Sequence, residues 1–358
     1  MEKVDMDLLN RCAIKDAKEL DRFPERKMIY HIVKSHFFRV PDIKIDKTTP
    51  IHINMSRREA IKTVLEFYQE LDNGMYEKAK SIITGTSKIP IYIYDKKAGS
   101  LNHYPNNPMV TTQKAVIYAY DKNGGKRRYI RNGRKTIFVP MRGEIEDVYD
   151  LSHELAHTMD TDLNTPTKFN SLLGETSTDC IENLMDYYLL RKGKITKNRV
   201  IQRRAMKAKG IKKDCMVMLA RMELAIALRQ NKSLNLDIIK KHLQKSGYTL
   251  TEEDIMVALQ EVIKERRSME YISRYIIGDL ITSPYFQRIY EQDPNKAKEM
   301  LVNFQEKMKK SSPEECIKTF GLNIDMETID MLINSKIGYV QGLEKEVNKG
   351  KESDIIIR

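Results

Sequence analysis

Two histidines and a glutamate lie close together in the segment His153-Glu154-Leu155-Ala156-His157. If this segment is helical, the two imidazoles lie one turn apart on the same face, because residues four apart are neighbours on a helix. Such a pair is typical of zinc ligands, and a carboxylate beside it is suited to act as a general base on a water molecule. The segment therefore predicts half of a catalytic Zn²⁺ site, with His153 and His157 as ligands and Glu154 as the base.

The surrounding residues predict the helix that this site needs. Residues 136–139 are typical of a short strand that Pro140 ends, and apolar residues recur at spacings of three and four from Glu144 to Met159. Acidic residues occupy the first turn of this segment, where the helix macrodipole favours them. The alternative interpretation is an amphipathic helix on which two surface histidines flank a glutamate.

A third protein ligand must be an Asp, Glu or His that the chain brings back to the same point. The arrangement H-E-x-x-H-x-x-G-x-x-H of the metzincins is excluded, because Asp160 and Leu163 stand at its glycine and histidine positions. Asp160 and Asp162 remain open as ligands. Glu175 is favoured, because a second helix is predicted from Phe169 to Leu190 and a polar turn before it lets the chain fold back antiparallel.

Asp179 follows Glu175 by one helical turn and is expected on the same face. A carboxylate in that place can accept the other ring N–H of a ligating histidine and fix its tautomer. The sequence thus predicts Asp179 as a partner of a ligand rather than as a ligand itself. The alternative is that Glu175 and Asp179 are two solvated acids.

The segment from Gly174 to Leu184 resembles the third-ligand helix of the thimet oligopeptidase and oligoendopeptidase F peptidases. In that family the ligand Glu is followed by a Ser and then by Glu-Asn at the same offsets. A second stretch is similar to the C-terminal end of oligoendopeptidase F, in this order: Tyr275–Ile281, Tyr290–Pro294, Ser311–Cys316 and Phe320–Asp325. The resemblance covers residues 135–335 and implies a zinc-dependent metalloendopeptidase of the gluzincin kind.

The chain departs from this family in three respects. It is too short to contain the long helical N-terminal region of the family, and its gap between His157 and Glu175 is shorter than the family's. Residues 264–269 also lack the histidine that helps to stabilise the tetrahedral intermediate. Tyr271 and Tyr275 match tyrosines of the family, so the resemblance implies a phenol donor to the developing oxyanion. Either tyrosine could instead be a core residue with a satisfied hydroxyl.

The composition is typical of a globular enzyme. The chain has 358 residues, 41% of them hydrophobic, and contains neither an apolar run long enough to span a membrane nor a signal-peptide pattern at its start. Its four scattered cysteines form no C-x-x-C pair, which favours a reducing compartment. We therefore expect a cytoplasmic protein, with leaderless secretion as an effector left open.

Changes in periodicity predict a mostly helical α+β fold. Residues 1–86 are expected to form a helical scaffold or specificity region, with a helix that Ser56 caps and that Asn73-Gly74 breaks. Residues 87–192 are expected to form a zincin-like catalytic module, in which a small antiparallel or mixed sheet covers the H-E-x-x-H helix. Residues 193–358 are expected to form a helical C-terminal subdomain that closes the cleft.

The formal net charge of +12 includes a basic run at residues 191–213 that contains no acid. This run could contact an anionic partner such as nucleic acid or a membrane surface, steer an acidic substrate, or be a solvated face. Three functions remain open beside a peptidase that trims peptides: a selective protease acting on one host protein, a metal-binding pseudoenzyme or interaction protein, and an anion-binding protein whose metal site is incidental.

Overall fold

The computed structural model describes residues 4–22, 26–44, 53–95, 107–111, 116–120, 126–130, 136–159, 171–248 and 250–355. The chain divides into two compact units, each built from separate stretches. Unit 1 comprises Met1–Asp46, Ile201–Tyr285 and Ile324–Arg358, and unit 2 comprises Lys47–Val200 and Phe286–Asn323. The three-part division at residues 86/87 and 192/193 stays a prediction.

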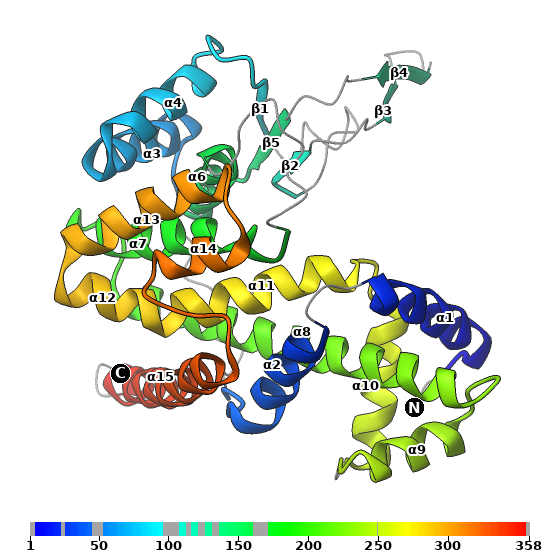
Figure 1. Cartoon of the computed structure of the whole chain (residues 1–358). Helices are drawn as coiled ribbons and strands as arrows, with labels where there is room; N and C mark the ends of the chain where they lie inside the picture. Colours follow the sequence, from blue (N-terminus) through cyan, green and yellow to red (C-terminus); the bar gives the residue numbers. More distant parts are fainter. Residues whose placement is uncertain are drawn as a thin grey trace. The chain divides into compact units, whose positions relative to one another are not determined.

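Unit 2 combines helices with the strands of the fold, as Figure 1 shows. Its helices are α3 (Arg57–Leu71), α4 (Asn73–Ile83), α6 (Glu146–Met159), α7 (Thr176–Arg191), α12 (Gln287–Gln292), α13 (Pro294–Met308) and α14 (Pro313–Lys318). Its strands are β1 (Ile91–Asp95), β2 (Met109–Thr111), β3 (Val116–Tyr120), β4 (Lys126–Ile130) and β5 (Thr136–Met141). The predicted mostly helical α+β class is confirmed.

The three-stranded sheet of unit 2 is mixed and has the order β1-β5-β2. β1 runs parallel to β5, and β2 runs antiparallel to it. Every residue of the central strand β5 is buried, as expected of a strand covered on both faces. β3 and β4 pair antiparallel, with Val116 opposite Ile130, while the predicted hairpin turn between them lies outside the described residues.

The strand β5 leads directly into α6 through a tight turn at Gly143. Gly143 has φ +84, a left-handed conformation that glycine adopts without steric cost. The Asp147 carboxylate accepts hydrogen bonds from the backbone N–H groups of Arg142 and Gly143 at 2.8 to 3.0 Å. This carboxylate thereby fixes the path from strand to helix, and α6 begins at Glu146, two residues after the predicted start.

The start predicted for α7 was wrong. Residues 171–173 form a short 3₁₀ turn, and α7 begins only at Thr176, with Glu175 as its N-cap residue. Leu172 and Leu173 are buried, and their spacing from the apolar residues of α7 suggests that they belong to the same helix. The spacing reflects their burial, because the two residues lie in the separate 3₁₀ turn. Glu175 therefore immediately precedes the first residue of α7 and does not lie within the helix.

The helix pair α3 and α4 follows the predicted capping with one correction. The Ser56 side chain accepts a hydrogen bond from the Glu59 N–H at 3.2 Å, as predicted for a helix start. The break lies at Asp72 rather than at Asn73-Gly74, because Asp72 is extended and its carboxylate caps α4 through the Met75 N–H at 2.8 Å. α3 and α4 both contact α6.

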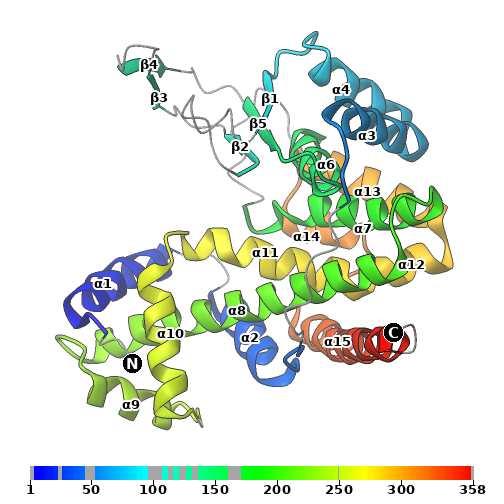
Figure 2. The same cartoon turned by 180° about the vertical axis from the view of Figure 1, so that it is seen from behind.

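All the regular secondary structure in the described residues of unit 1 is helical, and Figure 2 shows these helices from behind. They are α1 (Met6–Arg22), α2 (Arg26–Arg39), α8 (Lys197–Gln230, whose first turn belongs to unit 2), α9 (Leu236–Lys245), α10 (Glu252–Lys264), α11 (Met269–Ile281) and α15 (Met326–Ile355). One core cluster packs apolar residues of α1, α8, α9 and α10 together, including Leu9, Leu224, Ile239 and Leu259. The predicted helical character after residue 193 is confirmed for the described residues.

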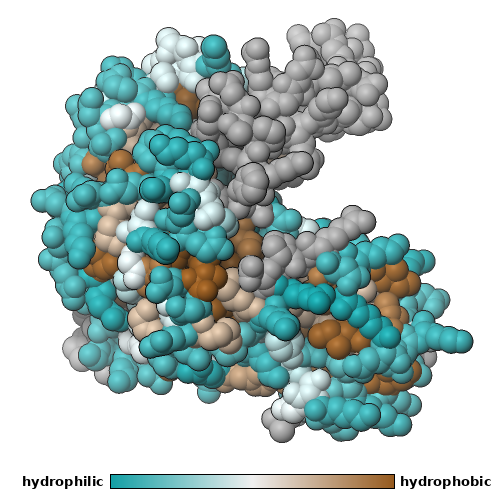
Figure 3. Space-filling model, viewed as in Figure 1, coloured by the Kyte–Doolittle hydropathy of each residue, from teal (hydrophilic) through white to brown (hydrophobic). Residues whose placement is uncertain are grey.

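Hydrophilic residues dominate the face shown in Figure 3, with smaller apolar patches between them. This surface agrees with a chain in which 31% of residues are charged. Among the described residues, exposed large hydrophobics such as Ile14, Phe38, Met206 and Val257 are scattered over several helices. None of the helices searched in the described part of the chain is both long and apolar enough to cross a membrane.

Candidate metal centre

The helix α6 holds the H-E-x-x-H segment in the interior of unit 2, between the sheet and α7. It contacts β5 and β2 of the sheet and also α3, α4 and α7. Leu151, Leu155 and Ala156 are fully buried, whereas the side chains of His153 and His157 retain 15% and 21% exposure. The histidine face is thus the one side of the segment that remains accessible.

α7 brings the predicted third ligand to these histidines. Its N-cap residue Glu175 makes no side-chain cap hydrogen bond to its own helix. The Thr178 hydroxyl donates to Glu175 Oε2 at 3.3 Å and to the Glu175 carbonyl at 2.8 Å, which holds the carboxylate in place. The Glu175 side chain is directed to α6 instead, and 5% of it is exposed.

Three donor atoms converge at this point. Glu175 Oε2 lies 3.3 Å from His153 Nε2 and 3.5 Å from His157 Nε2. The ligand atoms of the three residues all lie within 4.8 Å of one another. Two atoms bound to a tetrahedral zinc at about 2.0–2.2 Å are separated by about 3.3–3.6 Å. The donor types and the two separations from Glu175 Oε2 to the histidine nitrogens therefore suit a zinc ion with an open fourth position.

Glu154 lies on α6 between the two histidines in sequence, and only 4% of it is exposed. Its position on the same helix as His153 and His157 places it in the same part of unit 2 as the donor atoms.

Carboxylate groups surround His153. Burial lowers the pKa of His153, but hydrogen bonds to the Glu175 and Glu182 carboxylates outweigh it and raise the pKa well above its usual value. On the preceding turn of α6, burial raises the pKa of Asp150 to about 6, although the Arg142 guanidinium opposes this shift. Carboxylates that favour a proton on His153 equally favour a metal cation at the same place.

Glu182 contacts His153 from the side opposite to Glu175. Its Oε1 lies 2.8 Å from His153 Nδ1, and the His153 and Glu182 side chains are 15% and 16% exposed. Glu182 lies in the segment Gly174–Leu184 that resembles the peptidase family, but that resemblance predicted no role for it. Its spacing of seven residues from Glu175 was the available signal, since residues i and i+7 lie on one helix face.

The remaining predicted site residues fall in different places. Asp179 is buried in the first turn of α7, and its backbone N–H donates to the Glu175 carbonyl at 2.9 Å. Its role toward a histidine stays a prediction. Asp160 and Asp162 lie outside the described residues. Tyr271 and Tyr275 belong to unit 1, where they lie one turn apart on α11 with their hydroxyls 2.8 Å from each other.

Several members of the basic run at residues 191–213 pair with carboxylates inside their own unit. In unit 2, Arg191 and Lys192 both contact Glu70, and Arg199 contacts Glu146. In unit 1, Lys213 lies 2.6 Å from Glu261. These ion pairs join helices to one another and reduce the positive charge that residues 191–213 present to solvent. Binding of an anionic partner by these residues stays a prediction.

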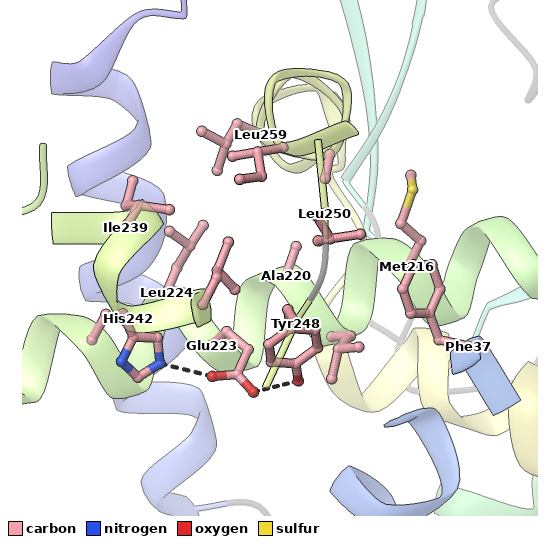
Figure 4. A pocket seen from close by; sticks show the side chains of 15 residues that line it. Phe37, Met216, Ala220, Glu223, Leu224, Ile239, His242, Tyr248, Leu250 and Leu259 are labelled. Atoms are coloured by element: carbon pink, nitrogen blue, oxygen red, sulfur yellow. Dashed lines mark hydrogen bonds and ion pairs between the residues drawn. The ribbon is translucent and has the colours of Figure 1, made fainter. Parts of the chain in front are cut away.

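A second buried polar cluster, in unit 1, was not predicted. The Glu223 carboxylate accepts hydrogen bonds from Tyr30 at 2.5 Å and Tyr248 at 2.6 Å, and lies 2.7 Å from His242 Nε2. Figure 4 shows Glu223, His242 and Tyr248 at the edge of an apolar pocket of about 40 Å³ between α8, α9 and α10. Burial, followed by the hydrogen bond to Glu223, raises the pKa of Tyr30 to about 12. The saturated carboxylate indicates a structural cluster that joins α2, α8 and α9.

No protein-family model matches the chain, and no curated protein matches it by sequence. Among solved structures, the chain is similar to a candidate peptidase from Chlamydophila abortus, with a TM-score of 0.45, 15% identity, and coverage of 95% of this chain and 56% of the other. It is also similar to oligoendopeptidase-F from Enterococcus faecium, with a TM-score of 0.44, 13% identity, and coverage of 97% and 54%. The chain thus spans about half the length of these two structures.

Proposed function

We propose that this chain is a zinc-dependent metallopeptidase that hydrolyses peptide bonds in a peptide or protein substrate. The observation that carries the proposal is the convergence of His153, His157 and Glu175, in which Glu175 Oε2 lies 3.3 and 3.5 Å from the two histidine nitrogens, as zinc ligands do. Glu154 on the same helix supplies the base that such a site needs. A structural zinc site would need a fourth protein ligand, and the described residues grouped here supply three.

In the proposed mechanism the two imidazoles and the Glu175 carboxylate would hold the ion. When bound, zinc lowers the pKa of water and polarises a carbonyl group. Glu154 accepts a proton from the attacking water and then delivers it to the leaving amine. This cycle returns Glu154 to its ionised state, so one residue serves as base and then as acid.

The oxyanion of the tetrahedral intermediate requires a hydrogen-bond donor. The sequence resemblance implies Tyr271 or Tyr275 for this role, and that assignment stays part of the proposal. The hydroxyls of Tyr271 and Tyr275 lie 2.8 Å apart and can hydrogen-bond to each other. A tyrosine that donates to the oxyanion would direct its hydrogen bond to the oxyanion in place of the other tyrosine.

The test is the substitution Glu154→Gln, which keeps the size of the side chain and removes the base. We expect zinc content to be unchanged and cleavage of a quenched-fluorescence peptide library to fall about 10²–10⁴-fold. Zinc is measured by elemental analysis of the purified protein. The matched control is Glu77→Gln on α4, an exposed glutamate whose loss should leave both zinc content and cleavage unchanged.

Three outcomes would contradict the proposal in different ways. Full activity of zinc-loaded Glu154→Gln would remove Glu154 from the mechanism. Zinc binding by the wild-type chain without turnover on any library peptide would favour a metal-binding pseudoenzyme. Binding to anionic vesicles or nucleic acid that depends steeply on salt and survives His153→Ala would favour the anion-binding alternative.

A further inference from the structure

His153 lies between two carboxylates that come from one helix. Its Nε2 lies 3.3 Å from Glu175 Oε2, and its Nδ1 lies 2.8 Å from Glu182 Oε1. Glu175 and Glu182 are seven residues apart, which is two turns and about 10.5 Å along α7. The imidazole therefore occupies the space between two carboxylates on the same face of α7, one facing each ring nitrogen.

We propose that Glu182 is a positioning residue that directs Nε2 of His153 to the metal. The proposal rests on the proposed zinc site and specifies how one of its ligands is oriented. A carboxylate at 2.8 Å from Nδ1 requires the proton of the neutral ring to lie on Nδ1, because only an N–H can donate to it. Nε2 is then the nitrogen that carries the lone pair, and it faces Glu175 and the zinc position.

The surroundings make this contact stronger than an exposed ion pair. Both side chains are about four-fifths or more buried, so solvent screens their interaction weakly. The α6 and α7 helices that carry them are also joined by the buried hydrogen bond from the Tyr149 hydroxyl to Asp186 at 2.8 Å. Since packing and this second bond already hold the helices together, the contribution of Glu182 should appear in the orientation of His153 rather than in folding alone.

The first experiment measures zinc affinity by competition with a chromophoric chelator for the full-length wild type, Glu182→Gln and Glu182→Ala. We expect Glu182→Ala to weaken zinc binding about 10–100-fold, as removal of a hydrogen-bond partner of a ligating histidine does. Glu182→Gln should lose less, because its amide oxygen still accepts from Nδ1–H. The control is Glu291→Ala on α12, where the glutamate accepts from Tyr187 at 2.7 Å. Equal affinity in all four proteins would overturn the proposal.

The second experiment observes the His153 ring directly by NMR of protein labelled with ¹⁵N-histidine, with the signal assigned from its absence in His153→Asn. We expect a downfield Nδ1–H proton in the wild type that persists in Glu182→Gln and is lost in Glu182→Ala. An unchanged signal in Glu182→Ala would overturn the proposal, even where that variant loses zinc. If the wild type binds no zinc, the proposed function fails, whereas the proton signal of the metal-free protein still decides the role of Glu182.

Discussion

Glu175 occupies the N-cap position of α7 without capping it through its side chain. Residues with short polar side chains usually occupy this position and accept a hydrogen bond from the following turn. Here the carboxylate is turned to the histidines of α6, while the positive end of the helix macrodipole stabilises its negative charge. A helix start thus supplies a ligand that the macrodipole favours electrostatically and that Thr178 restrains.

A prediction at the scale of single residues concerns the identity of the third ligand. We expect Glu175→Ala to weaken zinc binding by more than the roughly 100-fold that the loss of an outer hydrogen-bond partner causes. Asp160→Ala and Asp162→Ala are the matched controls and should bind zinc as the wild type does. Zinc retained by Glu175→Ala but lost by Asp162→Ala would instead assign the ligand to the aspartate. Chelator competition on the three purified variants decides between them.

The extent to which the site could be predicted from sequence follows from the range of the contacts involved. His153 and His157 could be read directly, because a spacing of four residues determines their neighbourhood on any helix. Glu175 required the further inference that the chain returns antiparallel. The contact between Glu182 and His153 depends on how α6 and α7 pack, and no local pattern contains that information.

At the scale of elements, α6 is held at several points along its length. The Tyr68 hydroxyl of α3 donates to the Ser152 carbonyl at 2.8 Å, and the Lys78 ammonium of α4 contacts the Thr158 carbonyl in the last turn. A cation at the C-terminal end of a helix is favoured by the macrodipole. The helix itself was predicted correctly because its apolar spacing is regular, whereas these anchors come from α3 and α4, more than 70 residues earlier in the chain.

The hydrogen bond between Tyr149 and Asp186 gives a prediction at this scale. Tyr149→Phe removes one donor from a fully buried carboxylate, so we expect the free energy of unfolding to fall by about 1–3 kcal/mol. The neighbouring Tyr187→Phe is a matched control, since its hydroxyl donates to Glu291 at the surface and its loss should cost less than about 0.5 kcal/mol. Urea unfolding of both variants measures the two free energies of unfolding. Equal decreases in the two variants would show that the hydrogen bond between Tyr149 and Asp186 contributes no more than the surface one.

At the scale of the whole molecule, unit 1 is assembled from three distant stretches of chain that meet at buried polar groups. Asp279 of α11 and Lys336 of α15 form an ion pair of 2.6 Å, with each side chain 1% exposed. His36 of α2 is fully buried, and the charge of Lys336 acts on it. The sequence predicted helices for all three segments but not this meeting point, because buried polar residues leave no periodic signal that identifies their partners.

His36 gives the last prediction, a dependence of stability on pH. Burial, followed by the charges of Lys336 and Lys212, lowers the pKa of His36 to about 3. An unfolded histidine has a pKa of about 6.5, so between these values the unfolded chain binds a proton that the folded chain does not. Stability therefore falls as pH falls below about 6.5, by up to about 1.4 kcal/mol per pH unit from this group.

The variant His36→Phe isolates this contribution, because it keeps an aromatic ring of similar size and cannot take up a proton. Between pH 7 and pH 5 the wild type should lose about 2 kcal/mol relative to the variant, as measured by urea unfolding at each pH. His153, whose pKa is raised, contributes with the opposite sign: its stabilisation is present at low pH and is lost as pH rises. That contribution is common to both proteins and cancels in the difference. A difference between wild type and variant that does not change with pH would show that His36 is not held neutral in the folded protein.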